Sequence, residues 1–269
     1  MSNTKDTITA VKTALSPARI GTYEVATGTV TDDDPRAIAL YAWTAQVSAA
    51  LFAPLHICEV VIRNAVSDAL ESVHGPRWPW QTGFILSLPS VQHGYSPRDD
   101  LRRVAAAQPT TGKVIPELKF VFWEQMFTLR HDLRLWNTHL KRVFPNHDPA
   151  KSISALRRGI YEDLEAIRKL RNRIAHHEPV FTISLSSELG RMIRLVNLRS
   201  SLVASWMVSN QSASLLVSQP PLFRGGVLWT PSHDEIAKVA YDLWSTAGRS
   251  ESSSAEADWI SAERLLMNL

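Results

Sequence analysis

The stretch that decides the fold runs from residue 153 to residue 179 and reads ISALRRGIYEDLEAIRKLRNRIAHHEP. Its apolar residues recur at steps of three and four, which places them on one stripe of an α-helix. They are Ile153, Leu156, Ile160, Leu164, Ile167, Leu170 and Ile174. Pro179 is expected to end the run. The pattern predicts one long amphipathic helix that packs along this stripe against other helices.

An earlier helical region is predicted over residues 37–73, where Pro54 is expected to kink or break the helix and His74-Gly75-Pro76 to end it. Its second half has a buried stripe of its own. The stripe consists of Leu55, Cys58, Ile62, Ala65, Ala69 and Val73.

Two further helices follow the same periodicity. One is predicted from Leu118 to Val143, where Pro145 ends the run, and the other from about Ser187 to Met207. The first buries Leu118, Phe122, Met126, Leu129, Leu133, Trp136, Leu140 and Val143, and the second buries Leu189, Ile193, Val196, Val203 and Trp206.

No stretch shows sustained strand alternation, so the fold class is all-α, a helical bundle with a C-terminal extension. The chain is divided into a polar N-terminal segment, residues 1–35, a helical domain, residues 36–208, and the extension, residues 209–269. The first segment ends in the acidic turn 32–35, where an aspartate can cap the next helix. Residues 75–115 read as an irregular connection with one short helix near Pro97–Ala107. Within the extension, residues 209–232 read as a loop, and short helices are expected at 234–245 and 256–266.

Composition places the chain among ordinary globular proteins: of 269 residues, 45% are hydrophobic and 20% charged, enough for one sizeable core. The single cysteine, Cys58, excludes an internal disulfide. The longest apolar window, Ala49–Ile62, contains Pro54 and Glu59 and is shorter than the roughly 20 residues that span a bilayer. The first ten residues, MSNTKDTITA, lack the plan of a signal peptide. We therefore expect a soluble cytoplasmic protein with no membrane partner.

Positive charge gathers in one part of the chain although the net charge is only +3. Between Arg98 and Arg173 there are 16 Lys and Arg residues against 9 Asp and Glu residues. This surplus fits a face for a polyanion, and it equally fits a solvated basic face without a ligand.

The chemistry that stands out lies at the end of the long helix, in Arg171-Asn172-Arg173-Ile174-Ala175-His176-His177-Glu178. Arg171 falls at the edge of the apolar stripe, so it must be partnered or face a cleft, since an unpaired buried charge is costly. Asn172 and His176 are one turn apart, and the helix end favours a protonated imidazole. Arginine, asparagine and histidine crowded at a helix end can hold and protonate a phosphodiester without a metal.

The same Arg-to-His spacing occurs elsewhere but in poorer context. Arg142 and His147 straddle Pro145, while Arg134 and His139 read as surface residues in the middle of a helix. A metal site at His176-His177-Glu178 is not expected, because adjacent helical residues point about 100° apart and no other His or Cys cluster adds ligands.

A second polar feature sits on the apolar stripe of the earlier helix. Glu59 lies between Leu55 and Ile62, and Arg63, one turn later, can pair with it. Glu59 could also reach Arg171 across the bundle. Two readings remain open: a structural ion pair that fixes helix register, and a pair that orients the site.

At these residues the sequence resembles the Abi-like proteins, abortive-infection proteins of bacteria that belong to the HEPN superfamily. Four stretches between about residues 15 and 208 carry the resemblance. They are Leu15-Ser16 with Arg19 and Tyr23; Leu40-Tyr41-Ala42-Trp43 with Glu59 and Arg63-Asn64-Ala65; Glu117-Leu118-Lys119-Phe120-Val121-Phe122-Trp123 with Trp136 and Phe144-Pro145; and Leu170 to Pro179. Val121 departs from the glycine expected before the Phe-Trp pair.

The resemblance implies a helical domain that dimerises so that two arginine–histidine motifs face one composite cleft. In active members it implies a metal-independent endoribonuclease without cofactors. The motif maps onto Arg171, Asn172 and His176 as catalytic residues, with His177 as the alternative histidine. Glu59, Arg63, Arg173 and His177 are assigned supporting roles. Glu178 or Pro179 stands where another branch has a modified tyrosine, so that regulation is not expected.

The implied function is RNA cleavage in anti-phage defence, by attack of the ribose 2′-OH on the adjacent phosphate. RNA is the expected substrate, a second copy the expected partner, and an antitoxin or a phage-derived trigger the expected regulator. Two rival readings are a non-catalytic helical module that binds RNA or protein, and a sensor subunit whose extension, residues 209–269, docks a phage component.

Overall fold

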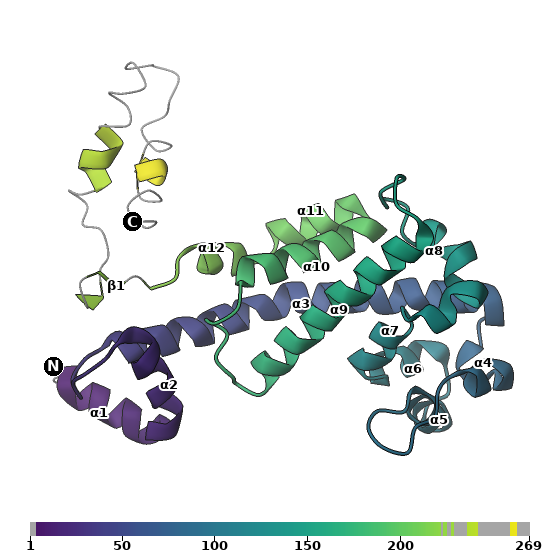
Figure 1. Ribbon diagram of the computed structural model, residues 1–269, viewed down its shortest axis with the longest axis horizontal. Coiled ribbons are helices and arrows are strands. Elements are labelled where there is room, and N and C mark those ends of the chain that lie inside the picture. The colour runs from purple at the N-terminus through teal and green to yellow at the C-terminus, as the bar shows by residue number, and fades with distance from the viewer. Residues whose placement is uncertain (1–3, 222, 225–226, 229–235, 242–258, 263–269) are drawn as a thin grey trace. The chain divides into compact units, whose positions relative to one another are not determined.

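The computed structural model describes residues 4–221, 223–224, 227–228, 236–241 and 259–262 (Figure 1). The fold is all-α, with one hairpin in which the two-residue strands β1 (Phe223–Arg224) and β2 (Val227–Leu228) pair in antiparallel fashion. The chain divides into two compact units, one formed by Met1–Gln46 and Ser218–Leu269 and the other by Val47–Val217. The domain boundaries drawn from sequence pattern, at residues 36 and 209, stay predictions.

The N-terminal segment, read as merely polar, forms two helices, α1 (Thr4–Leu15) and α2 (Pro17–Thr27). They form because their few large apolar side chains gather: Ile8, Ile20 and Tyr23 are all buried. At the acidic turn, Asp34 accepts a hydrogen bond from the backbone N–H of Arg36 at 2.9 Å, where α3 begins, which is the expected cap. The Arg36 side chain in turn donates to the carbonyl of Thr27 at 2.9 Å.

Helix α3 runs without interruption from Arg36 to His74, so of the two outcomes expected at Pro54 the break is not found, and the kink stays a prediction. Proline removes one backbone hydrogen bond, but Pro54 is itself buried next to Leu51 and Leu55, and tertiary packing holds the helix together. The predicted stripe is buried except for Val73, which is 38% exposed. The predicted end is confirmed, with Gly75 at φ +80° directly after the helix.

By length and composition, α3 could cross a membrane. It has 39 residues and contains an 18-residue window of mean hydropathy 1.6, of which 33% is buried inside the structure. Core helices of soluble proteins pass the same test, so this feature is weak evidence for a membrane span. The helix is longer than the apolar window Ala49–Ile62 on which the expectation of a soluble protein was based.

The connection after α3 is richer in helix than expected. It contains η1 (Trp78–Trp80), α4 (Thr82–Ser87), α5 (Pro97–Ala107) and α6 (Thr111–Glu117), of which only α5 was predicted. Two buried or half-buried indoles hold it: Trp78 donates to Ser67 Oγ at 3.1 Å, and Trp80 donates to the carbonyl of Ala105 at 2.9 Å. Contacts of this kind join residues far apart in the sequence, so the local spacing of apolar residues does not predict them.

The single helix predicted from Leu118 to Val143 is wrong. The segment is broken into α7 (Phe120–Gln125), η2 (Leu129–His131), the π-helical turn η3 (Asp132–Trp136) and α8 (Asn137–Val143). The break is stable because side chains satisfy the carbonyls it frees. Trp136 Nε1 donates to the Met126 carbonyl at 2.6 Å, and Arg157 Nη1 donates to the Phe127 carbonyl at 2.6 Å. Leu129 and Leu133, assigned to the stripe, are 72% and 85% exposed as a result.

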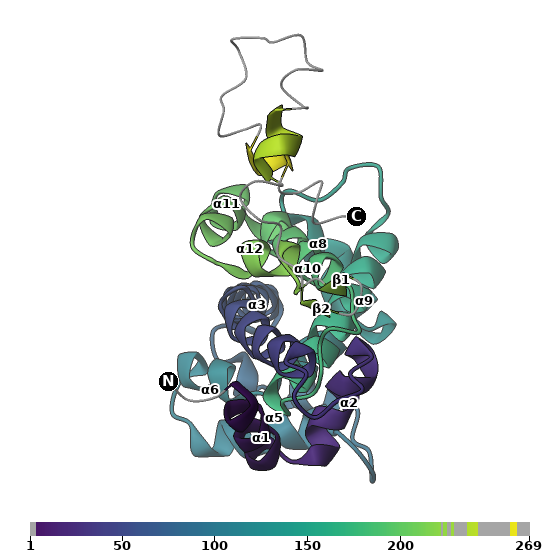
Figure 2. The same ribbon diagram turned by 90° about the vertical axis from the view of Figure 1, so that its left-hand side faces the viewer.

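The helix that decides the fold is confirmed as α9 (Ile153–Ala175), and its stripe is buried from Leu156 to Ile174. The fourth predicted helix is two helices, α10 (Leu185–Arg199) and α11 (Ser201–Ser209), because Ser200 is extended and its hydroxyl caps α11. Trp206, expected in the core, is 56% exposed. Figures 1 and 2 show α10 and α11 on one side of α3 and α6 on the other.

In the C-terminal extension, part of the predicted loop is the helix α12 (Ala213–Ser218), and the strands β1 and β2 follow it. Residues 236–241 and 259–262 are helical, in agreement with the two short helices expected there. The rest of those predicted helices lies outside the described residues.

We predict that Arg157→Met destabilises the fold by about 3–5 kcal/mol, because it leaves the buried Asp132 carboxylate without its cationic partner. The two groups lie 2.6 Å apart with side chains 9% and 12% exposed. Urea unfolding followed by circular dichroism measures the loss.

The neighbouring Arg158→Met is the matched control. Arg158 is 73% exposed and pairs loosely with Glu162 at 3.7 Å, so its loss is expected to cost less than about 1 kcal/mol. The double variant Arg157→Met with Asp132→Leu is expected to recover part of the stability. Equal stability of the two single variants would contradict the role given to Arg157.

Candidate functional site

The predicted helix end borders a cavity of about 510 Å³. Its lining comes from α9, from the segment between α6 and α7, and from α3. The lining residues are Arg63, Tyr95, Pro116, Glu117, Leu118, Lys119, Phe120, Val121, Arg168, Arg171 and Asn172. Of the residues predicted from the sequence, the structure therefore brings Arg63, Arg171 and Asn172 to one cavity.

Four cationic side chains line this cavity, and two of them are neutralised by carboxylates. Arg63 forms an ion pair with Glu59, and Arg168 donates to Glu124 at 2.5 Å. Arg171 is exposed and has no ion pair or hydrogen bond within the described residues. Glu117 adds one carboxylate to the lining. The four cations still outnumber the carboxylates of Glu59, Glu124 and Glu117, and Arg171 is the guanidinium available to an anion.

Arg63 is the most confined of these cations. Its Nη1 donates to the carbonyl of Pro116 at 3.2 Å, while its Nε is buried without a hydrogen-bond acceptor in the described part of the chain. Burial lowers the pKa of Arg63, the Glu59 carboxylate raises it, and the positive charge of Arg171 lowers it again. The two guanidinium groups therefore repel each other, and an anion between them would relieve that repulsion.

The far wall carries a tyrosine fixed by a carboxylate. The Tyr95 hydroxyl donates to Asp100 Oδ2 at 2.9 Å, and burial together with Asp100 raises the pKa of Tyr95. The Lys119 ammonium lies over the Tyr95 ring at 5.8 Å from its centroid. Tyr95 therefore stays a neutral phenol, and Lys119 presents its charge along the same wall.

The end of α9 has a defined geometry at the two histidines. The backbone N–H of Glu178 bonds to the carbonyl of Arg173 at 2.8 Å, and that of His177 bonds to the carbonyl of Ile174 at 3.1 Å. This pair of bonds is the Schellman ending, which needs a left-handed residue after the cap. His177 takes that place with φ +54°. Glycine is the usual residue there, so the position of His177 is backbone-strained.

His176 is the helix cap, and its side chain is exposed. Its backbone N–H bonds to the carbonyl of Asn172 at 2.9 Å, which places the two predicted catalytic residues on successive turns. The imidazole is not among the residues that line the cavity. In the single chain, the imidazole and the phosphate-binding candidates are neighbours along the helix but do not share one cavity.

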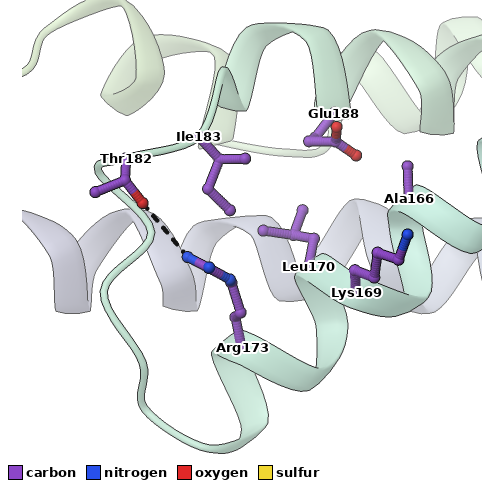
Figure 3. A pocket seen from close by; sticks show the side chains of 7 residues that line it. All are labelled: Ala166, Lys169, Leu170, Arg173, Thr182, Ile183 and Glu188. Carbon is purple, nitrogen blue, oxygen red and sulfur yellow. Dashed lines mark hydrogen bonds between the residues drawn. The ribbon is translucent and has the colours of Figure 1, made fainter.

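Arg173 turns away from this cavity toward a second one, drawn in Figure 3. Its Nη1 donates to the carbonyl of Pro179 at 3.1 Å and to Thr182 Oγ1 at 3.4 Å, and it lies 3.8 Å from Glu178. Arg173 thus ties the chain after α9 back to the helix.

Glu59 pairs with Arg63 and makes no ion pair with Arg171 in the described part of the chain. The sequence analysis missed Arg168, Lys119 and Tyr95. Arg168 lies one turn before Arg171, so its helical spacing was an available signal. Lys119 and Tyr95 reach the cavity only through the tertiary fold. Over the described residues, no three His, Cys, Asp or Glu side chains gather in a way that could hold a metal ion.

We predict that His177→Gly is more stable than His177→Ala by about 1 kcal/mol. Both variants lose the imidazole, so their difference isolates the cost of a left-handed backbone at a residue with a Cβ atom. Thermal unfolding of the two variants measures it. The same comparison at His176, whose φ is −93°, is expected to favour alanine, and the reverse order at either site would contradict this helix ending.

The family model described as "Protein of unknown function (DUF2934)" matches residues 231–267, a stretch of 37 residues in the C-terminal extension. No curated protein and no solved structure matches the chain. The family match thus concerns the extension, and no residue of either cavity or of the helix end falls within it.

Proposed function

We propose that this chain is a metal-independent endoribonuclease of the HEPN type, with Arg171, Asn172 and His176 as its catalytic residues. The proposal is carried by one observation: Arg171, which has no ion pair or hydrogen bond within the described residues, lines a cavity that Arg63, Arg168 and Lys119 also line. Asn172 stands beside it, and His176 follows one turn later. A cavity with surplus positive charge is suited to an RNA phosphate.

The chemistry needs only groups that the chain and the RNA supply. His176, as general base, removes the proton of the ribose 2′-OH, whose oxygen attacks the adjacent phosphorus. The bond from phosphorus to the 5′ oxygen breaks, and a protonated imidazole gives that oxygen its proton. The products are a 2′,3′-cyclic phosphate and a 5′-OH. Arg171 stabilises the charge that develops on the phosphoryl oxygens, and Asn172 orients the phosphate.

A second copy of the chain would complete this site. In one chain the His176 imidazole lies outside the cavity that Arg171 lines, and a dimer would bring a partner's helix end to the same cleft. Two imidazoles would then serve as base and acid. The dimer with its composite cleft and the HEPN-like arrangement of the bundle are part of the proposal and derive from the resemblance.

The biological setting is proposed on the resemblance alone. It comprises abortive infection as the role, the cytoplasm as the location, and an antitoxin or a phage-derived trigger as the regulator. The extension, residues 209–269, lies outside the resemblance, and its role as a docking element for such a trigger is the corresponding hypothesis. Deletion of residues 219–269 separates the roles, because RNase activity is expected to persist in the shortened chain while defence is lost.

The second candidate is a non-catalytic module that binds RNA. The exposed imidazole outside the cavity favours it, since phosphate binding by Arg171, Arg63 and Lys119 needs no proton transfer. This candidate predicts that His176→Ala binds RNA like the wild type and that no cleaved product forms with either protein.

The test is cleavage of single-stranded RNA by the purified protein in EDTA. We expect cleavage by the wild type and a loss of about 100-fold or more in Arg171→Ala and in His176→Ala. A DNA strand of the same sequence should stay intact, because it lacks the 2′-OH nucleophile.

Arg134→Ala and His139→Ala are the matched controls, because this pair has the same spacing and lies outside the cavity. Both are expected to cleave like the wild type. Mapping the product ends as cyclic phosphate and 5′-OH checks the mechanism. Cleavage by His176→Ala at the wild-type rate would overturn it, and His177→Ala shows whether the neighbouring histidine acts instead.

A further inference from the structure

A second cavity has a volume of about 270 Å³ (Figure 3). The α9 residues that line it, 166, 169, 170 and 173, fall on the opposite flank of the helix from residues 168, 171 and 172, which line the first cavity. Ala166, Leu170 and Ile183 form its apolar walls, and Lys169, Arg173 and Glu188 bring charges to it. In Figure 3, Glu188 enters from α10 on one side, and Lys169 and Arg173 enter from α9 on the other. The catalytic proposal uses none of its apolar residues and does not use Glu188.

Glu188 is held in place with one oxygen unused. Its side chain is 12% exposed, and Oε1 lies 3.4 Å from Arg191 Nε. Arg191 in turn donates to Asp163 at 2.7 Å, which fixes the pair. Oε2 is buried and has no hydrogen-bond partner in the described part of the chain. A buried carboxylate oxygen without a donor is costly. Because Oε2 is closed off from the cavity in this position, a ligand that supplies the donor requires the Glu188 side chain to turn toward it.

The cations of this cavity are more exposed than its carboxylate. The side chains of Lys169 and Arg173 are 65% and 43% exposed, against 12% for Glu188. Lys169 pairs with Glu165 at 3.0 Å and Arg173 lies 3.8 Å from Glu178, so a ligand anion would compete with these exposed carboxylates. A ligand that fits this arrangement has hydrogen-bond donors at its buried end, a planar apolar group in the middle and a negative charge at its outer end. A cationic peptide side chain would satisfy Glu188 but would meet Lys169 and Arg173 at the entrance.

We propose that this cavity, the guanine pocket, binds a guanine nucleotide, with the Watson–Crick edge of the base on Glu188 and the phosphate toward Lys169 and Arg173. Guanine is the base that presents two adjacent donors, N1–H and the exocyclic amine, to a carboxylate. Adenine and cytosine place a ring acceptor beside their amine, and uracil places carbonyl oxygens beside its single N–H. In this arrangement the flat base would contact the apolar side chains of Leu170 and Ile183.

The nucleotide can be free or part of an RNA chain. Arg173 is three residues from His176, about 4.5 Å along the helix axis, so a guanosine held here would lie near the proposed cleavage site. As a subsite for RNA the pocket rests on the proposed function, whereas as a nucleotide site it does not.

Calorimetric titration of the full chain with GMP, AMP, CMP and UMP tests the proposal without any cleavage. GMP is expected to bind about tenfold or more tightly than the other three, and Glu188→Gln is expected to remove that preference, because the amide places a donor against a donor. Ala166→Phe fills the pocket without touching an ion pair and is expected to abolish binding.

Glu162→Gln is the matched control, since Glu162 lies on α9 outside both cavities and is 62% exposed. It is expected to bind GMP like the wild type, and melting temperatures verify that each variant is folded. Equal affinity for the four nucleotides, no binding at millimolar GMP, or unchanged GMP affinity in Glu188→Gln would overturn the guanine pocket.

Two further measurements separate this proposal from the nuclease. Arg171→Ala is expected to bind GMP normally, so loss of cleavage and loss of nucleotide binding are independent results. If RNA is cleaved, removal of guanines from the substrate is expected to slow cleavage when the pocket serves RNA. Unchanged cleavage together with GMP binding would assign the pocket to the free nucleotide.

Discussion

The packing of the bundle depends on two arginines of α9 that hold the broken segment between Phe120 and Val143. Arg157 binds the Phe127 carbonyl and Asp132, and Arg168, three turns later on the same side of the helix, binds Glu124. A helix break inside a core frees carbonyls that must find donors. Arg157 and Trp136 supply donors at the break, and the Arg168 pair fixes the start of the segment, which forms the cavity wall opposite Arg171.

This constraint explains why the arginines on this side of α9 differ in what they can do. Arg157 and Arg168 are neutralised and structural, whereas Arg171, nearly in line with them on the helix, has no ion pair or hydrogen bond among the described residues and interacts electrostatically with Arg63. The Arg157–Asp132 and Arg168–Glu124 ion pairs therefore hold the segment next to Arg171 and leave the Arg171 guanidinium group without a carboxylate partner among the described residues.

The spacing of apolar residues along the sequence correctly predicted the features that depend on a single helix. The stripe and the end of α9, the end of α3 and the bounds of α5 follow from spacing, proline and capping. The same spacing gave wrong predictions where contacts with residues distant in the sequence determine the local structure. Pro54 stays helical because it is buried, the 118–143 run breaks because Trp136 and Arg157 satisfy its carbonyls, and Ser200 divides the last helix by capping α11. Among the residues that line the first cavity, Arg171, Asn172 and Arg63 were predicted from the sequence, whereas Lys119 and Tyr95 could not be predicted because they reach the cavity only through the tertiary fold.

The left-handed His177 links the two flanks of α9. A helix that continued past Ala175 would carry His176 and its successors on into solvent, whereas the Schellman ending turns the chain so that Arg173 can reach back to Pro179 and Thr182. After that return, Ile183 and Glu188 line the second cavity together with Leu170. One strained residue thus ends the helix at the proposed catalytic imidazole and closes the neighbouring pocket. The backbone strain at His177 therefore accompanies both the helix end at His176 and the second cavity. Replacement of His177 by glycine relieves this strain and should leave both features intact.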